Sequence, residues 1–239
     1  MTNRHQELLT LIKQHSGKGT QHTELDAYLG TSHFRYPINM PTLRKLLKTW
    51  ASEHKEIKPA ELATLISSLL EGESSTEKVT GGLLLDYFPA QRKQLKPALY
   101  DEWLNHVEGW SEIDALCQGH FTPEEMLEHW NEWKKTITQL SKSKNIEKRR
   151  GAMVLLVTPA LQSGDEKFST LALELFERTK HEKDILITKA ISWLARCMVK
   201  HQRKALEEYL AEHKDSLPKI AVRELMVKLE TGKKTKKKL

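Results

Sequence analysis

Residues 59–70 read PAELATLISSLL, with apolar side chains at positions 62, 65, 66, 69 and 70. Steps of three and four residues between apolar positions are the period of an α-helix that buries one face. Pro59 suits the first helical position, and Gly72 with the pair Ser74-Ser75 provides an end signal. The stretch therefore predicts an amphipathic helix that must pack against a neighbour.

The same period continues through almost the whole chain. In the first half it predicts helices at 8–12, 43–50, 79–88, 95–107, 110–117 and 122–140. In the second half it predicts helices at 147–161, 167–179, 184–200, 204–213 and 217–230. Thr122 and Glu125 form the pattern of a capping box, with Pro123 at the first helical position. Convincing apolar–polar alternation is missing, so we predict no β-strands.

Helix pairs joined by short polar turns recur at roughly 35–40 residues, the range of HEAT and armadillo repeats. We therefore predict an all-α, right-handed solenoid of HEAT-like antiparallel helix pairs with a concave basic face. Residues 1–230 should form a single domain of these HEAT-like repeats. Residues 231–239 should be a disordered, lysine-rich tail.

The composition excludes several classes of protein. Charged residues make up 29% of the 239 residues, and apolar runs stay well below the ~18 residues that a membrane span needs. The N-terminus is too polar for a signal peptide. Cys117 and Cys197 lie far apart, so neither a zinc site nor a disulfide framework is indicated. We expect a cytoplasmic protein without metal, cofactor or membrane partner.

The charge is distributed unevenly. Five of the last seven residues are lysines, so the formal net charge of +6 leaves only +1 for the rest of the chain. Residues 1–140 hold 15 basic and 19 acidic residues, whereas residues 141–204 hold 14 basic and 7 acidic. A basic segment of this kind is typical of a surface that contacts phosphate.

Trp110 and Asp114 lie four residues apart, so a helix places them on one face. An indole and a carboxylate on one face could line a concave pocket. Alternatively, Trp110 packs between helix pairs and Asp114 compensates the helix dipole.

Arg149 and Arg150 open a predicted helix, where the positive end of the dipole disfavours cations. Consecutive helical residues point about 100° apart, so one arginine can face a ligand while the other faces solvent or a neighbouring helix. An anion such as phosphate, or a nearby carboxylate, would offset their charge.

Trp193 and Arg196 share one side of a helix that is apolar over much of its surface. Arg196 could bind a phosphate through two nitrogens. Burial of Trp193 in the helical array is the alternative.

The eleven histidines are scattered without metal-ligand spacing, and His120 and His129 are predicted to be surface residues. The chain also lacks a phosphate-binding loop and a nucleophile elbow.

Taken together, the chain resembles the DNA alkylation repair family of the AlkC and AlkD type, most closely the AlkD-like DNA glycosylases with HEAT-like repeats. Four motifs carry the resemblance, in order along the chain: Tyr28-Leu29-Gly30-Thr31 with Pro41-Thr42-Leu43-Arg44; Trp110-x-x-x-Asp114; Arg149-Arg150-x-Ala152; and Ile191-Ser192-Trp193-Leu194-Ala195-Arg196. The aromatic residue that often precedes the arginine pair in this family is replaced here by Ile146-Glu147-Lys148.

The resemblance implies hydrolysis of the N-glycosidic bond of cationic N3- or N7-alkylated purines in double-stranded DNA, without base flipping. It makes Asp114 the catalytic carboxylate, which stabilises the oxocarbenium ion on the sugar and positions a water. It places Trp110 and Trp193 beside the deoxyribose. Tyr28, Arg44, Arg149, Arg150 and Arg196 are the implied DNA contacts, and we prefer Arg150 within the arginine pair. A monomer is expected, since one concave face suffices to hold a duplex.

Two other functions fit the sequence. One is a non-catalytic protein of the same architecture that binds branched or distorted DNA. The other is a solenoid whose concave face takes a peptide or a partner helix.

Overall fold

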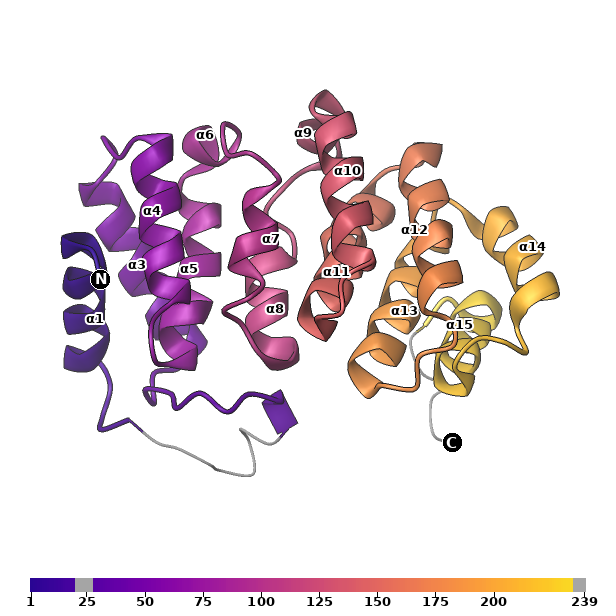
Figure 1. The fold of residues 1–239 in the computed structure, drawn as a ribbon, viewed down its shortest axis with the longest axis horizontal. Helices are drawn as coiled ribbons and strands as arrows, with labels where there is room; N and C mark the ends of the chain where they lie inside the picture. The colour runs from indigo at the N-terminus through magenta and orange to yellow at the C-terminus, as the bar shows by residue number, and fades with distance from the viewer. Residues whose placement is uncertain (20–27, 234–239) are drawn as a thin grey trace. The chain divides into compact units, whose positions relative to one another are not determined.

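The computed structural model describes residues 1–19 and 28–233, and these residues form fourteen α-helices (Figure 1). The chain divides into two compact units, Met1–His120 and Phe121–Leu239. Across the described ranges, no helix is both long enough and apolar enough to cross a lipid bilayer. The expectation of an all-α fold is confirmed, whereas the expectation of a single domain stays a prediction.

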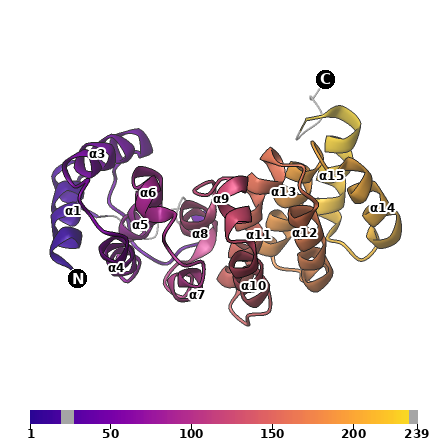
Figure 2. The same cartoon turned by 90° about the horizontal axis from the view of Figure 1, so that it is seen from above.

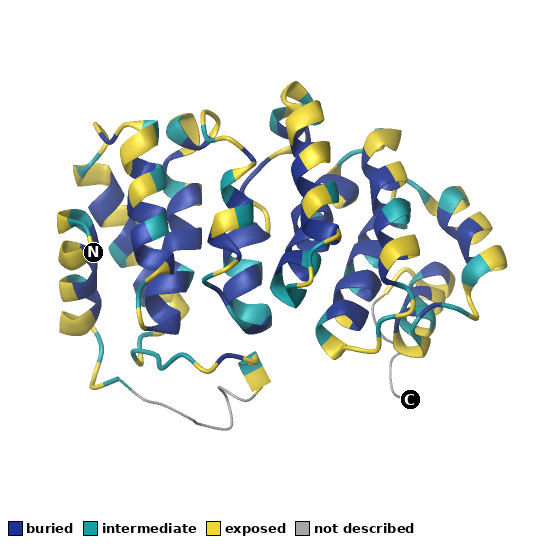
Figure 3. Cartoon of the chain, viewed as in Figure 1, coloured by how far each residue is buried: buried dark blue, intermediate teal, exposed yellow. Residues whose placement is uncertain are grey.

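The first unit is built around α5. Its helices are α1 (Asn3–Gln14), α3 (Met40–Glu53), α4 (Pro59–Leu70), α5 (Ser75–Tyr87), α6 (Pro89–Arg92), α7 (Leu99–Trp103) and α8 (Gly109–Cys117). Helices α3, α5 and α8 lie side by side, while α4 packs against α5 and α1 packs against α4 (Figure 2). Almost all of α5 is buried, as its dark blue ribbon in Figure 3 shows. A helix with neighbours on all sides has no polar face to reveal it as amphipathic.

The second unit consists of helix pairs. Its helices are α9 (Pro123–Glu128), α10 (Trp130–Ser141), α11 (Ile146–Gln162), α12 (Glu166–Thr179), α13 (Ile185–Met198), α14 (Arg203–His213) and α15 (Lys219–Thr231). Helices α11, α13 and α15 form one row, and α10 and α12 pack against one side of this row (Figure 2). This arrangement confirms the paired helices that the sequence predicts.

Side-chain caps fix where many helices begin. Asn39, Asn145, Asp165 and Asp184 each accept a hydrogen bond from a backbone N–H in the first turn of the helix that follows. The predicted capping box at Thr122 and Glu125 is present. A second box, Ser74 with Glu77, starts α5 four residues before the predicted start at Val79. Each such cap contributes about 1 kcal/mol to the stability of its helix.

Two predicted helices differ from the observed ones. The predicted helix 122–140 is divided at His129, whose φ of −116° and ψ of 34° lie outside the helical range. No sequence breaker marks this position. The division accompanies the packing of Trp133 against Phe121 and of Trp130 against Phe168. The predicted helix 95–107 shrinks to α7, Leu99–Trp103. Its late start agrees with Pro97, which restricts the backbone before it and lacks an N–H.

The C-terminal helix ends where the basic tail begins. Helix α15 runs to Thr231, and Gly232 closes it at a φ of 68°, in the left-handed region that glycine adopts without strain. The predicted disorder of the tail concerns mainly residues 234–239, which lie outside the described residues.

A buried polar pair joins α1 to α5. His5 Nε2 lies 2.8 Å from Glu77 Oε1, and His5 Nδ1 lies 2.9 Å from the hydroxyl of Ser68 in α4. Only 1% of the His5 side chain and 3% of the Glu77 side chain are exposed. Burial raises the pKa of Glu77, but the hydrogen bonds from His5 and Ser74 lower it by more than burial raises it. The net pKa therefore lies below the ordinary value of 4.5.

We predict that Glu77→Gln lowers the free energy of unfolding by about 1–3 kcal/mol at pH 7, because buried partners lose their acceptor. The pKa is lower in the folded state, so the charged form stabilises the fold above pH 4.5, and this contribution is lost as the pH falls below that value. Urea unfolding at pH 7 and pH 3.5 measures both effects. The exposed variant Glu73→Gln is the control, and equal stability of the two variants at pH 7 would contradict the prediction.

Candidate functional site

Trp110 and Asp114 line one cavity in the first unit. Both belong to α8, both are half-buried, and the cavity has a volume of about 470 Å³. Its walls come from α3, α5, α8 and residues 35–38. A cavity of this size, with apolar walls and a few polar groups, is typical of a ligand site. The structure thus places Trp110 and Asp114 on the wall of one cavity. This is the first of the two alternatives for this pair, a shared pocket instead of packing between helix pairs.

The indole of Trp110 is fixed by the segment that follows residue 27. Trp110 Nε1 donates a 2.8 Å hydrogen bond to the carbonyl oxygen of Tyr28. The Tyr28 ring meets the indole edge to face, with 5.5 Å between ring centroids. Tyr28 itself is 64% exposed. It is therefore available at the surface beside Trp110, where the sequence predicts a DNA contact.

Two glycines allow this segment to approach the start of α8. Gly109 has a φ of +67° and Gly30 a φ of +75°. A Cβ atom on Gly109 would lie 2.3 Å from the carbonyl oxygen of Leu29, far inside van der Waals contact. Position 109 therefore requires glycine for two independent reasons, backbone conformation and space.

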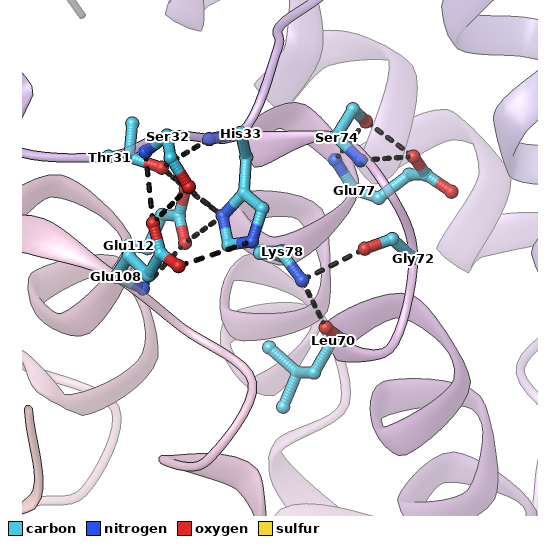
Figure 4. A network of polar contacts seen from close by, with 10 residues as sticks. All are labelled: Thr31, Ser32, His33, Leu70, Gly72, Ser74, Glu77, Lys78, Glu108 and Glu112. Carbon is cyan, nitrogen blue, oxygen red and sulfur yellow. Dashed lines mark hydrogen bonds and ion pairs between the residues drawn. The ribbon is translucent and has the colours of Figure 1, made fainter. Parts of the chain in front are cut away.

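Two glutamates hold the same segment through hydrogen bonds (Figure 4). The Glu108 carboxylate accepts from the backbone N–H of Ser32 at 2.9 Å and from its hydroxyl at 2.6 Å. The fully buried Glu112 accepts from the hydroxyl of Thr31 at 2.7 Å and from the N–H of Glu108 at 2.9 Å, and His33 Nδ1 lies 3.1 Å away. The hydrogen bonds from Ser32 keep the pKa of Glu108 below its ordinary value although burial raises it.

A buried lysine lies next to this network. Lys78 Nζ donates to the carbonyl oxygens of Leu70 at 2.6 Å and Gly72 at 2.8 Å (Figure 4). Burial lowers the pKa of Lys78, while the nearby charges of Glu112 and other carboxylates act in the opposite direction. The lysine thus joins the end of α4 to α5 beneath the start of α8.

The opposite end of α8 is held by His120. Its side chain is 2% exposed, so the prediction that His120 is a surface residue was wrong, whereas His129 is exposed as predicted. His120 Nδ1 lies 2.7 Å from Asp86 Oδ1, and Nε2 lies 2.8 Å from the carbonyl oxygen of Ala115. No local sequence pattern indicates this contact, since Asp86 is 34 residues away.

Asp86 also faces Arg44, one of the predicted DNA contacts. Arg44 Nη1 lies 3.6 Å from Asp86 Oδ2, and 51% of the Arg44 side chain is exposed. Burial raises the pKa of Asp86. The hydrogen bond with His120 and the nearby groups His120, Arg44 and Arg92 lower it by a larger amount, so the net pKa lies below its ordinary value. Asp86 is therefore ionised near neutral pH, beside His120 and Arg44.

Both arginines of the pair in the second unit contact protein groups. The guanidinium of Arg149 binds Glu182, with Nη2 at 2.7 Å and Nε at 2.9 Å, and Nη1 donates to the carbonyl oxygens of Ser143 and Lys144. Arg150 is only 3% exposed and donates to the carbonyl oxygen of Leu186 at 2.8 Å. Arg149 keeps 19% exposure of its side chain, so it is the more accessible of the two.

Trp193 and Arg196 lie on α13. Trp193 is half-buried, so the alternative of full burial does not apply. Arg196 Nη1 donates to the hydroxyl of Ser192 and to the carboxylate of Glu224 on α15, and 11% of its side chain is exposed. The negative group that offsets Arg196 is thus supplied by the protein itself.

The described residues hold no group of three or more His, Cys, Asp or Glu side chains placed to bind a metal ion.

Comparisons with known proteins give the family of the chain. A family model described as DNA alkylation repair enzyme matches residues 16–229, so the chain belongs to that family. A solved structure described as a predicted DNA alkylation repair enzyme from Enterococcus faecalis has the same fold: the TM-score is 0.72 at 19% sequence identity, over 90% of this chain and 99% of that chain. A comparison with curated proteins finds no match. Membership of the family indicates a role in repair of alkylated DNA, and hence binding to DNA.

We predict that Gly109→Ala lowers the free energy of unfolding by about 1–3 kcal/mol, since the new Cβ meets backbone and the φ becomes strained. Urea unfolding followed by tryptophan fluorescence measures the loss. Gly164→Ala is the matched control, because its Cβ would meet nothing closer than 3.9 Å. A Gly109→Ala protein within 0.5 kcal/mol of the wild type, roughly the range of neutral surface changes, would refute the close approach of the two glycine backbones.

Proposed function

We propose that this protein is a DNA glycosylase that removes cationic N3- or N7-alkylated purines from double-stranded DNA. The observation that carries the proposal is the placement of Trp110 and Asp114 on one cavity of a DNA alkylation repair family member. We further propose that the protein acts as a monomer in the cytoplasm and leaves the damaged base stacked in the duplex.

The chemistry demands little beyond these two side chains. An alkylated purine already carries a positive charge, so its bond to C1′ breaks with the electron pair moving to the base. Asp114 would stabilise the oxocarbenium ion that remains on the sugar and orient the water that attacks C1′. At about 4 Å and an effective dielectric constant near 20, a carboxylate attracts a unit positive charge by roughly 4 kcal/mol. That energy corresponds to about a thousandfold in rate.

Trp110 would contribute a second attraction to the same cation. An indole face attracts a nearby positive charge by about 0.5–2 kcal/mol. The hydrogen bond from Trp110 Nε1 to Tyr28 restricts the orientation of the ring before DNA binds. Trp193, which is half-buried on α13, is the second candidate aromatic contact to the DNA.

Arginines would supply contacts to the phosphate backbone. Arg44 and Arg149 are the stronger candidates, because Arg44 is half exposed and Arg149 is more accessible than Arg150. Arg149 would exchange its carboxylate partner Glu182 for a phosphate. Arg150 and Arg196, both largely buried, would support their helices and act on DNA indirectly.

We predict that Asp114→Asn lowers the release of 7-methylguanine from methylated duplex DNA by about a hundredfold or more, with DNA affinity kept. The amide has the size of the carboxylate but no charge to stabilise the oxocarbenium ion. Single-turnover release and fluorescence anisotropy measure the two quantities. Asp215→Asn, at an exposed position of the second unit, is the control and should retain full activity.

Other outcomes of this experiment would redirect the proposal. No release by the wild type, together with binding to branched DNA, would favour the non-catalytic DNA-binding function. Release of uracil or hypoxanthine at rates comparable with 7-methylguanine would contradict the mechanism, because these neutral bases lack the charge that makes the alkylated purine a leaving group.

We predict that Arg149→Ala weakens DNA binding and reduces the slope of log affinity against log salt concentration by about 1, because one phosphate contact is lost. Anisotropy titrations between 50 mM and 200 mM salt measure the slope. Arg178→Ala is the control, since Arg178 is another arginine of the same unit that lies near a carboxylate, Glu174, at 3.7 Å. An unchanged slope for Arg149→Ala would remove Arg149 from the phosphate contacts.

A further inference from the structure

The histidine behind α8 has acceptors on both sides of its ring. His120 Nε2 lies 2.8 Å from the carbonyl oxygen of Ala115, and Nδ1 lies 2.7 Å from the carboxylate of Asp86. A carbonyl oxygen only accepts hydrogen bonds, and an ionised carboxylate also only accepts. The two ring nitrogens of His120 therefore connect two acceptors, one on α5 and one on α8. The ring acts as a rigid bridge between the end of α5 and the last turn of α8.

The carbonyl of Ala115 needs such a donor. It belongs to the last turn of α8, whose final carbonyls have no partner within the helix. Gly119 has a φ of +82°, which turns the chain back so that His120 faces the helix end. From the other side, α5 approaches so closely that a Cβ on Gly82 would lie 2.2 Å from the Ala115 oxygen. This carbonyl is thus held between two elements, one residue away from Asp114.

Asp86 and His120 also influence the electrostatics of the cavity that holds Asp114. Asp86, His120 and Arg44 all line the cavity together with Asp114. A second carboxylate near Asp114 would raise the cost of ionising both groups. His120 and Arg44 offset the charge of Asp86, at 2.7 Å and 3.6 Å. Asp86 is thereby committed to two protein partners instead of a substrate.

We propose that Asp86 and His120 form a positioning pair that fixes the last turn of α8 and so holds the Asp114 carboxylate at its place in the cavity. The inference rests on the proposed glycosylase function and extends it to residues that touch neither DNA nor the reacting atoms. Reaction rates are sensitive to such placement, since a shift of about 1 Å can cost a hundredfold in rate.

The test compares His120→Gln, Asp86→Asn and the double variant in single-turnover release of 7-methylguanine and in DNA affinity. Each single variant should reduce the rate about tenfold or more while the Kd for DNA stays within about twofold. The double variant should be no slower than the slower single variant, because the pair acts as one unit. His129→Gln, at an exposed position, is the matched control.

Two further measurements test the positioning role of His120 if these variants fold poorly. In wild-type protein with ¹⁵N-labelled histidine, NMR should detect a ring N–H of His120 that exchanges slowly with solvent, as expected for a buried, hydrogen-bonded group. In His120→Ala, added imidazole should restore part of the lost rate by filling the vacated space. Rapid exchange of the ring hydrogen, or no rescue in a folded His120→Ala protein, would overturn the proposal.

The outcomes separate this inference from the proposed function. An active wild type, an inactive Asp114→Asn and fully active pair variants would overturn the positioning pair alone. A loss of rate in Asp86→Asn as large as in Asp114→Asn would also overturn it, by making Asp86 a catalytic residue. A fall in DNA affinity in proportion to the rate would indicate a structural role only. An inactive wild type would overturn both proposals.

Discussion

The position of α8 depends on a contact between two glycine backbones. Gly30 and Gly109 both adopt positive φ, and no side chain would fit between position 109 and the carbonyl of Leu29. At this separation Glu108 accepts hydrogen bonds from Ser32, and Glu112 accepts one from Thr31. The indole of Trp110 bonds to the same segment. A steric constraint therefore comes first, and the polar network and the aromatic contact follow from it.

Polar side chains contact both ends of α8. At the start, the fully buried Glu112 accepts hydrogen bonds from a hydroxyl and a backbone N–H. At the end, the buried His120 lies between the Ala115 carbonyl and Asp86. Burying charge is unfavourable unless each group is paired, so such networks contribute more to a unique geometry than to stability. A site that must place one carboxylate accurately benefits from supporting groups whose own positions are fixed.

Two candidate DNA-contacting arginines of the second unit are held by ion pairs within the protein. Arg149 and Arg196 are each bound by a carboxylate of the same unit, Glu182 and Glu224. Any phosphate that approaches them must compete with that partner, which lowers affinity but keeps a cationic side chain ordered before binding. Because phosphate contacts release counterions, the balance between the two partners shifts with salt concentration. In the proposed complex with DNA, internal ion pairs as well as net charge would therefore set the electrostatic part of binding.

The sequence by itself determined most of the helices, the capping box at Thr122 and the shared face of Trp110 and Asp114, because helical periodicity and capping depend on residues at most four apart. It also predicted the family, which the match over residues 16–229 confirmed. Only the tertiary structure decided that Arg150 is buried, that helix 122–140 divides at His129 and that His120 lies inside the first unit. These features arise from contacts between residues far apart in the chain, such as His120 with Asp86, and no local pattern encodes them.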